Sequence, residues 1–387
     1  MKVPLFRPKL GKEELVNLKK VFKTGWVGLG PMTKELEERF AKSIGVKHAI
    51  GVTSCTAAMH IAVQALGIKK GDEVIVPAIT VVSTPYAALY NGATPVFADV
   101  DPISICLDPA DFERKITKRT KVVMPVHLGG HSCDMDAILK IAKKHGIFVV
   151  EDCANAQGAS YKGKMVGSFG DIGCFSFEAK KNMTTGDGGM AVTNNPALAE
   201  KLKALRWYGS SSDTWKRFTG NAKYSWHYDV SELGWKYNMT DIMAAIGLAQ
   251  LKKLPTALKA KDKLRARYNQ VLQGISWLKI PNDRPYTKSG WWLYIARIKN
   301  GWRDKFIVYM AENGITTSVH FPPVYRHSVF KKIGLAANCP VAEKISEEIV
   351  SLPLFAGMNE KEFNYVVSVI KKFQEKLLPF LGRSILY

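Results

Sequence analysis

The sequence predicts an α/β protein, with a mainly parallel sheet in a large first domain and a smaller α+β domain at the C-terminus. Over the first two-thirds of the chain, short β-branched runs alternate with amphipathic stretches, the pattern of a sheet joined by crossover helices. After residue 254 this alternation stops. At 387 residues the chain has room for two or three domains. We therefore expect a large domain over 1–254 and a small domain over 255–387.

The individual elements follow from apolar periodicity and from the residues that begin and end each run. Strands are predicted over 73–79, 94–100, 121–128, 147–152, 172–177 and 190–193. Helices are predicted over 56–66, over 135–145 with Asp134 as N-cap, and over 240–254, where Pro255 should end the helix. The small domain should hold a charged helix over 259–272, a strand pair over 291–298 and 315–320, and a helix from Glu360.

Composition and charge restrict the class of protein. The chain is 47% hydrophobic and 23% charged, which is ordinary for a globular protein, and no run approaches the roughly 20 apolar residues of a membrane helix. With no apolar run near the N-terminus, we expect a cytoplasmic protein without a membrane partner. The net charge of +21 is spread along the chain rather than clustered, so it indicates a diffusely basic surface more than a nucleic-acid partner. The 6 cysteines form no CxxC pair and are expected to be free thiols.

The most informative stretch is 170–195, in which a strand runs into Lys180 and Lys181 and then into a turn, TTGDGG. A lysine held between a strand end and a glycine-rich turn can be shielded from water. Shielding lowers the pKa of the amine, as a Schiff-base lysine requires. Taken alone, the stretch favours a solvated lysine pair on a hairpin over a shielded lysine.

Two further stretches carry groups that suit a pyridine cofactor. The strand VVED ends in Glu151 and Asp152, at the edge where open α/β sheets bind ligands, and a carboxylate there could hold a pyridinium nitrogen protonated. Near residue 54 a short strand passes through small hydroxylic residues into a helix, whose N-terminal amides could hold a phosphate. Each alone could be an ordinary helix cap.

A metal site at His127 and His131 is not expected. The two histidines lie four residues apart, as ligands on a helix do, but Gly129 and Gly130 stand between them and no third ligand is close in sequence. We therefore predict no metal.

Taken in order, these stretches resemble the nucleotide-sugar aminotransferases of the DegT/DnrJ/EryC1/StrS family, which are fold-type-I (aspartate-aminotransferase-like) enzymes that use pyridoxal 5′-phosphate (PLP). The resemblance covers nearly the whole chain. It rests on GWVG, GDEVIVPAITVVST, GATPVFADVD, EDCANAQGA, GDIGCFSF, TTGDGG, ELGWKYNMTDIMAAIGLAQLKKL, ITTSVHFPPV and SLPLF. The large first domain would then bind PLP.

The resemblance implies a role for individual residues. The Schiff-base lysine of the family falls five positions after the serine of FSF, which here makes it Lys181 and not Lys180. Asp152 matches the carboxylate that pairs with the pyridine nitrogen, and Asn155 stands beside the phenolic oxygen of the ring. The residues that match the phosphate contacts are Ser176, Cys55 and Thr56.

Several positions depart from the family pattern. Glu178 and Lys180 replace the usual residues before the lysine, and Val81 replaces an aromatic residue. The family loop GYNYR reads GWKYN here and usually reaches the PLP phosphate of a neighbouring subunit in a homodimer. Either Lys236 or Asn238 could make that contact.

The resemblance also implies the reaction. Glutamate would donate an amino group to PLP on Lys181, and a nucleotide-linked keto sugar, first of all a 4-keto sugar, would accept it, as in amino-sugar and cell-surface polysaccharide biosynthesis. Arg217, beside Lys216, is a candidate for the substrate pyrophosphate, and His320 for the sugar.

Alternative activities stay open at this point. One is an aminotransferase acting on a cyclitol or aminobenzoate-type precursor. A sugar dehydratase of the same fold would carry histidine in place of Lys181. From another class, a PLP-binding regulatory protein that binds nucleic acid would explain the positive charge.

Overall fold

The computed structural model describes residues 1–210 and 228–381, with side chains to residue 373. Its centre is a 7-stranded sheet in the order β1-β9-β8-β5-β4-β2-β3. These strands are β1 (His48–Val52), β2 (Glu73–Pro77), β3 (Thr94–Ala98), β4 (Thr120–Val123), β5 (Phe148–Asp152), β8 (Ile172–Ser176) and β9 (Gly189–Thr193). Only β9 runs against the others, because it pairs antiparallel with both β1 and β8. The predicted α/β class and mainly parallel sheet are confirmed.

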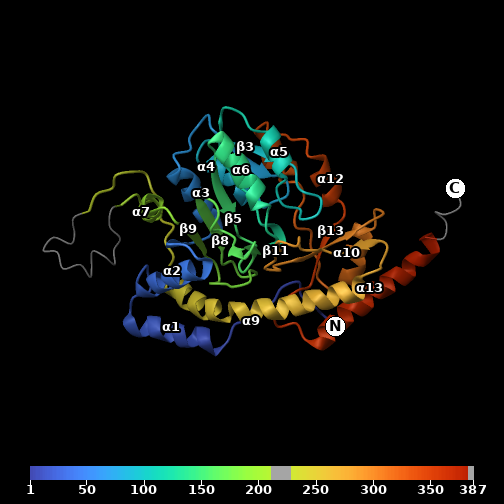
Figure 1. Ribbon diagram of the computed structural model, residues 1–387. Helices are drawn as coiled ribbons and strands as arrows, with labels where there is room; N and C mark the ends of the chain where they lie inside the picture. The colour runs from blue at the N-terminus through green and yellow to red at the C-terminus, as the bar shows by residue number, and fades with distance from the viewer. Residues whose placement is uncertain (211–227, 382–387) are drawn as a thin grey trace.

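Helices cover both faces of this sheet (Figure 1). They are α1 (Lys12–Thr24), α2 (Pro31–Ile44), α3 (Cys55–Ala65), α4 (Ser83–Tyr90), α5 (Pro109–Arg114), α6 (Met135–His145) and α7 (Pro196–Leu205), with a 3-10 turn η1 (Leu128–Gly130). Asp134 caps α6 as predicted, since its side chain accepts a hydrogen bond from the amide of Ala137.

Alternation along the strands sends side chains into two separate cores. On β8, Cys174 joins the core under α3, α4 and α6, whereas Phe175 joins the core under α2 and α9 (Asp241–Leu272). On β9, Ala191 and Met190 divide in the same way. Both faces of the sheet are therefore buried, which explains why these strands read as almost continuous apolar runs.

The helix α9 corrects the prediction that Pro255 ends a helix. It runs unbroken from Asp241 to Leu272 with Pro255 inside it, so the two helices expected over 240–254 and 259–272 are one. Pro255 is exposed, so water can hydrogen-bond to the carbonyl group that loses its donor. Thr240 caps the start of the helix by accepting from the amide of Met243. Figure 1 shows α9 running from beside α1 and α2 to beside α13 (Glu360–Leu381).

The C-terminal part of the chain builds a second core around a 3-stranded sheet in the order β10-β12-β13. Its strands are β10 (Leu278–Lys279), β12 (Tyr294–Ile298) and β13 (Ile349–Leu352), and α10 (Arg303–Glu312) and α13 pack against them. In contrast, α11 (Ser328–Lys332), α12 (Pro340–Ser346) and the 3-10 turn η2 (Val324–Arg326) pack on the core of the large sheet. The remaining short strands, β6 (Ser160–Tyr161), β7 (Lys164–Met165) and β11 (Thr287–Lys288), form a separate small sheet.

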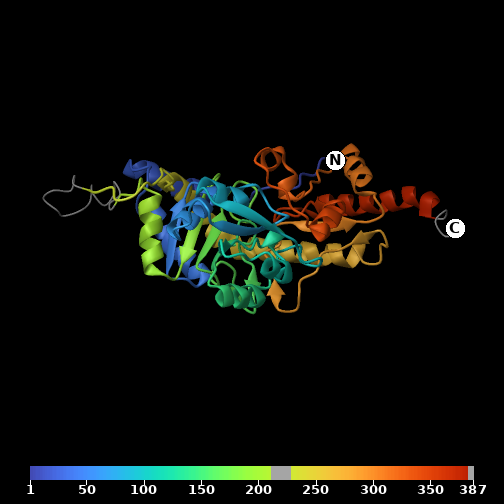
Figure 2. The same ribbon diagram turned by 90° about the horizontal axis from the view of Figure 1, so that it is seen from above.

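The strand predicted over 315–320 is wrong. That segment makes only isolated bridges, Val3 with Ile315 and Ser318 with Ser351, because β12 already pairs with β10 and β13 on its two sides. Val3 also packs in the second core, so the N-terminus lies against the C-terminal part of the chain (Figure 2). The division at residue 254 falls inside α9 and stays a proposal.

Two further predictions concern the cysteines and the membrane. All 6 cysteines are buried and free, as expected. Within residues 1–210 and 228–381, no helix has both the length and the apolar content to cross a membrane.

We expect Phe175→Ala to destabilise the protein strongly. Phe175 is fully buried and meets the ring of Phe40 edge to face at 5.0 Å, so its truncation leaves a cavity between the sheet and α2. The free energy of unfolding, measured by urea denaturation, should fall by about 3–5 kcal/mol. The matched control Phe148→Ala removes a ring that is 42% exposed on β5 and should cost less than about 1 kcal/mol. An equal loss in both variants would contradict this assignment of the core.

Candidate active site

The predicted functional residues meet at the carboxyl edge of the large sheet. Asp152 is the last residue of β5 and Ser176 the last residue of the neighbouring β8. The chain after β1 turns directly into α3, which begins at Cys55. Parallel strands place their carboxyl ends on one edge, so residues more than a hundred positions apart come together there.

Lys181 lies in a shielded position beside this edge. Its ammonium donates a hydrogen bond of 2.9 Å to Oδ1 of Asn155 and sits 3.6 Å from the centre of the Trp292 ring. Burial lowers the pKa of Lys181 to about 8, although the electrostatic influence of Cys55 and Asp152 opposes the shift. The environment predicted for a Schiff-base lysine is therefore present.

Lys180, the neighbouring lysine, has a different environment. Its side chain is 62% exposed and lies 3.9 Å from a carboxylate oxygen of Glu178. The two lysines thus differ in burial, and only Lys181 is directed into the site.

Asp152 is a buried carboxylate with a dedicated set of donors. Its Oδ2 accepts from the hydroxyl of Thr84 at 2.9 Å, and its Oδ1 accepts from the amide of Ala154 at 3.0 Å. Thr84 in turn shares a hydrogen bond of 2.7 Å with Thr80. Burial raises the pKa of Asp152, while these hydrogen bonds act in the opposite direction. The carboxylate is thereby fixed at the sheet edge.

The start of α3 offers amides and hydroxyls. Ser54 caps the helix by accepting from the amide of Ala57, and the hydroxyl of Thr56 donates to that of Ser83 at 3.0 Å. Cys55 is buried, and burial raises the pKa of its thiol well above the ordinary value, so it contributes its backbone rather than a thiolate. This helix start is a suitable place for a phosphate.

The glycine-rich turn allows β9 to approach α3 closely. A Cβ added to Gly189 would lie 2.4 Å from the carbonyl carbon of Ser54 and 2.6 Å from the amide nitrogen of Cys55. Any side chain there would displace the start of the helix. The turn therefore serves the site by bringing two backbones together.

His320 enters the site from the C-terminal part of the chain. Its Nδ1 hydrogen-bonds to the hydroxyl of Ser351 at 2.9 Å, and its ring packs edge-on against Phe6 and Trp292. Burial, and then the positive charge of Lys181, lower the pKa of His320 to about 4. A histidine in this environment is neutral at pH 7 and is partnered within the fold.

The two candidates in the GWKYN loop contact each other. The ammonium of Lys236 donates to Oδ1 of Asn238 at 2.7 Å and lies 3.1 Å from the ring centre of Trp207. Asn238 is buried and donates to the carbonyl of Met239, whereas Lys236 is exposed. The other basic candidates, Lys216 and Arg217, lie outside the described residues.

His127 belongs to a hydrogen-bond network rather than to a pair with His131. Its Nε2 bonds to Glu151 at 3.0 Å and its Nδ1 accepts from the amide of Cys133. Glu151 also accepts from three backbone amides, those of Gly167, Phe169 and Gly170. With Cys153 these residues form a compact buried cluster of metal-ligand type. Since both ring nitrogens and both carboxylate oxygens already have partners, the cluster is explained as a structural network.

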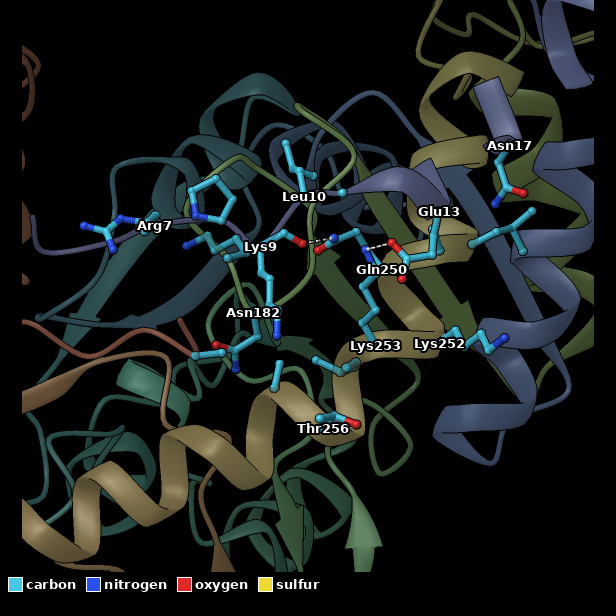
Figure 3. Close-up of a pocket in the computed structure, with 18 of the residues that line it drawn as sticks. Arg7, Lys9, Leu10, Glu13, Asn17, Asn182, Gln250, Lys252, Lys253 and Thr256 are labelled. Carbon is cyan, nitrogen blue, oxygen red and sulfur yellow. Dashed lines mark hydrogen bonds and ion pairs between the residues drawn. The ribbon is translucent and has the colours of Figure 1, made fainter. Parts of the chain in front are cut away.

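A cavity of about 830 Å³ lies between the N-terminal segment, α1, α2 and α9, and reaches residues 180–182 (Figure 3). Its basic lining residues are Arg7, Lys9, Lys12, Lys20, Arg39, Lys180, Lys181, Lys252, Lys253 and Lys261, and its acidic ones are Glu13 and Glu35. Lys253 is paired with Glu13 and Glu14, but the lining remains strongly basic.

Sequence reasoning missed Thr84, Trp292 and Lys261. Thr84 stands in PAITVVST, a stretch for which no helix was predicted. Nothing in its position along the chain indicated that its hydroxyl would contact Asp152. Trp292 and Lys261 read as a strand residue and a charged helix position. Only their contacts in the folded protein distinguish these two residues from ordinary strand and helix positions.

Comparisons with known proteins agree with this geometry. Residues 8–371 match the model of the DegT/DnrJ/EryC1/StrS aminotransferase family. The uncharacterized protein MJ1066 of Methanocaldococcus jannaschii is 42% identical over 377 residues, which cover 96% of this chain and 97% of that protein. The spore coat polysaccharide biosynthesis protein SpsC of Bacillus subtilis is 41% identical over 376 residues, 95% of this chain and 96% of that protein.

Solved structures show the same fold. Spr1654 of Streptococcus pneumoniae in its PLP form has a TM-score of 0.90 at 31% identity, covering 98% of this chain and 100% of that one. The sugar aminotransferase CalS13 of Micromonospora echinospora has a TM-score of 0.87 at 27% identity, covering 96% and 99%.

The fold and the site define an enzyme that transfers amino groups, and the predicted enzyme class and family are confirmed. The chain belongs to the DegT/DnrJ/EryC1/StrS aminotransferase family. The donor set at the sheet edge also fits PLP, because it offers an amine of lowered pKa, a buried carboxylate, and hydroxyls at a helix start.

We expect His320 to make stability depend on pH between about 4 and 6.5. Its folded-state pKa is about 4 against 6.5 in the unfolded chain, so the unfolded state binds more protons in this window and stability falls as the pH falls. From pH 7 to pH 5 the free energy of unfolding of the wild type should fall by about 2 kcal/mol more than that of His320→Gln. Urea denaturation at the two pH values measures the difference, and equal falls would contradict the buried neutral histidine.

Proposed function

We propose that the protein is a PLP-dependent sugar aminotransferase that moves an amino group from glutamate to a nucleotide-linked keto sugar. The observation that carries the proposal is that the shielded amine of Lys181 and the buried carboxylate of Asp152 lie at the same edge of the sheet, close enough to influence each other electrostatically. A 4-keto sugar is the first candidate substrate. We expect the reaction to take place in the cytoplasm.

The residues at the sheet edge would hold PLP at three places. Asp152 would pair with the pyridine nitrogen and keep it protonated, and Asn155 would serve the phenolic oxygen. Ser176, the hydroxyl of Thr56 and the amide of Cys55 at the start of α3 would hold the phosphate. When bound, PLP supplies an electron sink that stabilises negative charge at the substrate carbon.

Lys181 carries the cofactor covalently and later moves the proton. With a pKa of about 8, a useful fraction of its side chain is the free amine at neutral pH. With PLP bound, that amine would act as the base that accepts the proton of the substrate carbon and as the acid that gives it back. Asn155 and the face of Trp292 hold the protonated ammonium in between, because both contact it directly.

Two features support a sugar substrate that carries phosphate. SpsC is named for spore coat polysaccharide biosynthesis and CalS13 for sugar aminotransfer, which favours a role in making cell-surface amino sugars. The cavity beside residues 180–182 has a strongly basic lining, which suits a pyrophosphate. His320 is a secondary candidate for contact with the sugar, and Arg217 for contact with the pyrophosphate.

A homodimer with shared sites is part of the proposal. Leu15, Val16 and Phe22 of α1 are 60%, 52% and 63% exposed, which is unusual for apolar side chains and suits a surface covered by a second copy. Of the two loop residues, Lys236 is the exposed one, so we assign the contact with the PLP phosphate of the neighbouring subunit to Lys236 and its orientation to Asn238.

We expect Lys181→Ala to abolish both turnover and the yellow colour of the PLP-bound protein, because it removes the amine that binds the cofactor. Lys180→Ala is the matched control and should keep the yellow colour and measurable turnover, since the side chain of Lys180 is 62% exposed and lies beside Glu178. Absorbance spectra and borohydride reduction followed by peptide mapping measure the outcome. A borohydride label on any residue other than Lys181 would overturn the mechanism.

The substrate is tested with a panel of nucleotide-linked keto sugars and glutamate, with the amino product detected by mass. We expect a 4-amino sugar to form. Turnover of a cyclitol or aminobenzoate-type precursor alone would favour the alternative within the family. A salt-sensitive complex with DNA, together with no turnover, would favour a regulatory protein.

A further inference from the structure

Lys261 is a buried lysine in the middle of α9 that borders the basic cavity and to which the proposed reaction gives no individual role. Its side chain is almost fully covered, and it forms no ion pair within the described part of the chain. Its ammonium donates to Oδ1 of Asn182 at 2.9 Å and to the carbonyl of Trp292 at 3.2 Å. Burial of an ammonium without a carboxylate is unfavourable, so the contacts that it makes instead point to a role.

The first contact, Asn182, directly follows Lys181 in the chain and has no spare hydrogen-bonding group. Its Nδ2 donates to the carbonyls of Gln157 at 3.2 Å and Gly290 at 2.7 Å. Its backbone amide donates to Oε1 of Gln157 at 3.0 Å. With Oδ1 taken by Lys261, every donor and acceptor of the side chain is occupied. The backbone on the C-terminal side of Lys181 is therefore held in one position.

The second contact, Trp292, holds the N-terminal side. Its indole nitrogen donates to the carbonyl of Lys180 at 2.9 Å, and its ring face lies 3.6 Å from the ammonium of Lys181. The ring of Phe6 stacks on the indole with the ring centres 5.7 Å apart. The position of this indole therefore decides both the backbone before Lys181 and the surface on which the ammonium rests.

We propose that Lys261 is a positioning residue for Lys181, because one ammonium ties Asn182 and Trp292 together from the interior of α9. The proposal rests on the proposed function of Lys181. Lys261 touches neither the cofactor contacts at the sheet edge nor the start of α3. It acts through the two residues that hold the segment 180–182 from opposite sides.

The consequence for Lys181 is electrostatic as well as geometric. The charged or titratable groups that influence it are Cys55, Asp152, Glu178 and Lys180, with His320 also within its electrostatic reach, and burial outweighs them in lowering its pKa to about 8. If the tie through Lys261 is lost, Asn182 and Trp292 can move and water can reach the ammonium. The pKa of Lys181 should then rise toward the ordinary lysine value.

The test compares Lys261→Met with the matched control Lys263→Met, whose side chain is exposed on the same helix. In each cofactor-free protein, the rate of acetylation of Lys181 by trace acetic anhydride is measured by mass spectrometry from pH 6 to pH 11. We expect Lys261→Met to raise the pKa of Lys181 by about one unit, which reduces its reactivity at pH 7 about tenfold. Lys263→Met should match the wild type. Lys261→Arg keeps the donors and should restore part of the reactivity.

A second measurement separates positioning from simple stabilisation. The melting temperature of Lys261→Met should change by only a few degrees, about 4 °C or less, while the reactivity of Lys181 changes. The proposal would be overturned if the melting temperature of Lys261→Met fell while the pH profile of Lys181 acetylation stayed that of the wild type. It would also be overturned if neither quantity changed. If Lys261→Met does not fold, Lys261→Gln, which keeps an amide donor on a shorter chain, is judged by the same profile.

Failure of the proposed function has a different signature. Borohydride reduction of the wild-type PLP-bound protein would then leave Lys181 unlabelled, whatever residue stands at position 261. The acetylation profile would still report the environment of Lys181, so the two proposals are decided separately.

Discussion

The structure depends on keeping an ammonium and a carboxylate out of water at the edge of one sheet. Burial lowers the pKa of Lys181 and raises that of Asp152, so both charges are held against a free energy cost. The fold offsets that cost with local donors and acceptors. Thr84 and the amide of Ala154 serve the carboxylate, and Asn155 with the face of Trp292 serves the ammonium.

The surrounding elements are arranged to keep these partners in place. Gly189 allows β9 to pass within van der Waals range of the start of α3, which brings hydroxyls and amides to the same edge. The helix α9 begins under the large sheet and ends in the second core, where Tyr268 packs on Phe363. Because it is one rigid element, it places Lys261 behind the segment that carries Lys181 and couples the two parts of the chain.

Much of this could be predicted from residues that are close in sequence. The strands of the sheet, the Asp134 cap and the position of Asp152 at a strand end follow from local apolar runs and short motifs, whereas Lys181 was chosen through the family resemblance. The errors came where tertiary contacts outweigh local preference. Pro255 does not end α9. It lies on the exposed side of the helix, where a missing backbone hydrogen bond costs little, and the helix residues before and after it are held by packing. The segment 315–320 is not a strand, because the edges of β12 were already taken.

By itself the sequence determined the family and the mainly parallel sheet, and through the family resemblance it singled out Lys181 and Asp152 as candidates, since each rests on contiguous runs of residues. Only the tertiary structure decided that Lys181 is shielded and Lys180 is not, that Thr84 serves Asp152, and that Lys261 stands behind Asn182 and Trp292. The physical reason is that burial and hydrogen bonding depend on neighbours in space. Those neighbours are contributed by segments far away in the sequence, as when Trp292 contacts Lys180 and Lys181, and no local pattern reveals them.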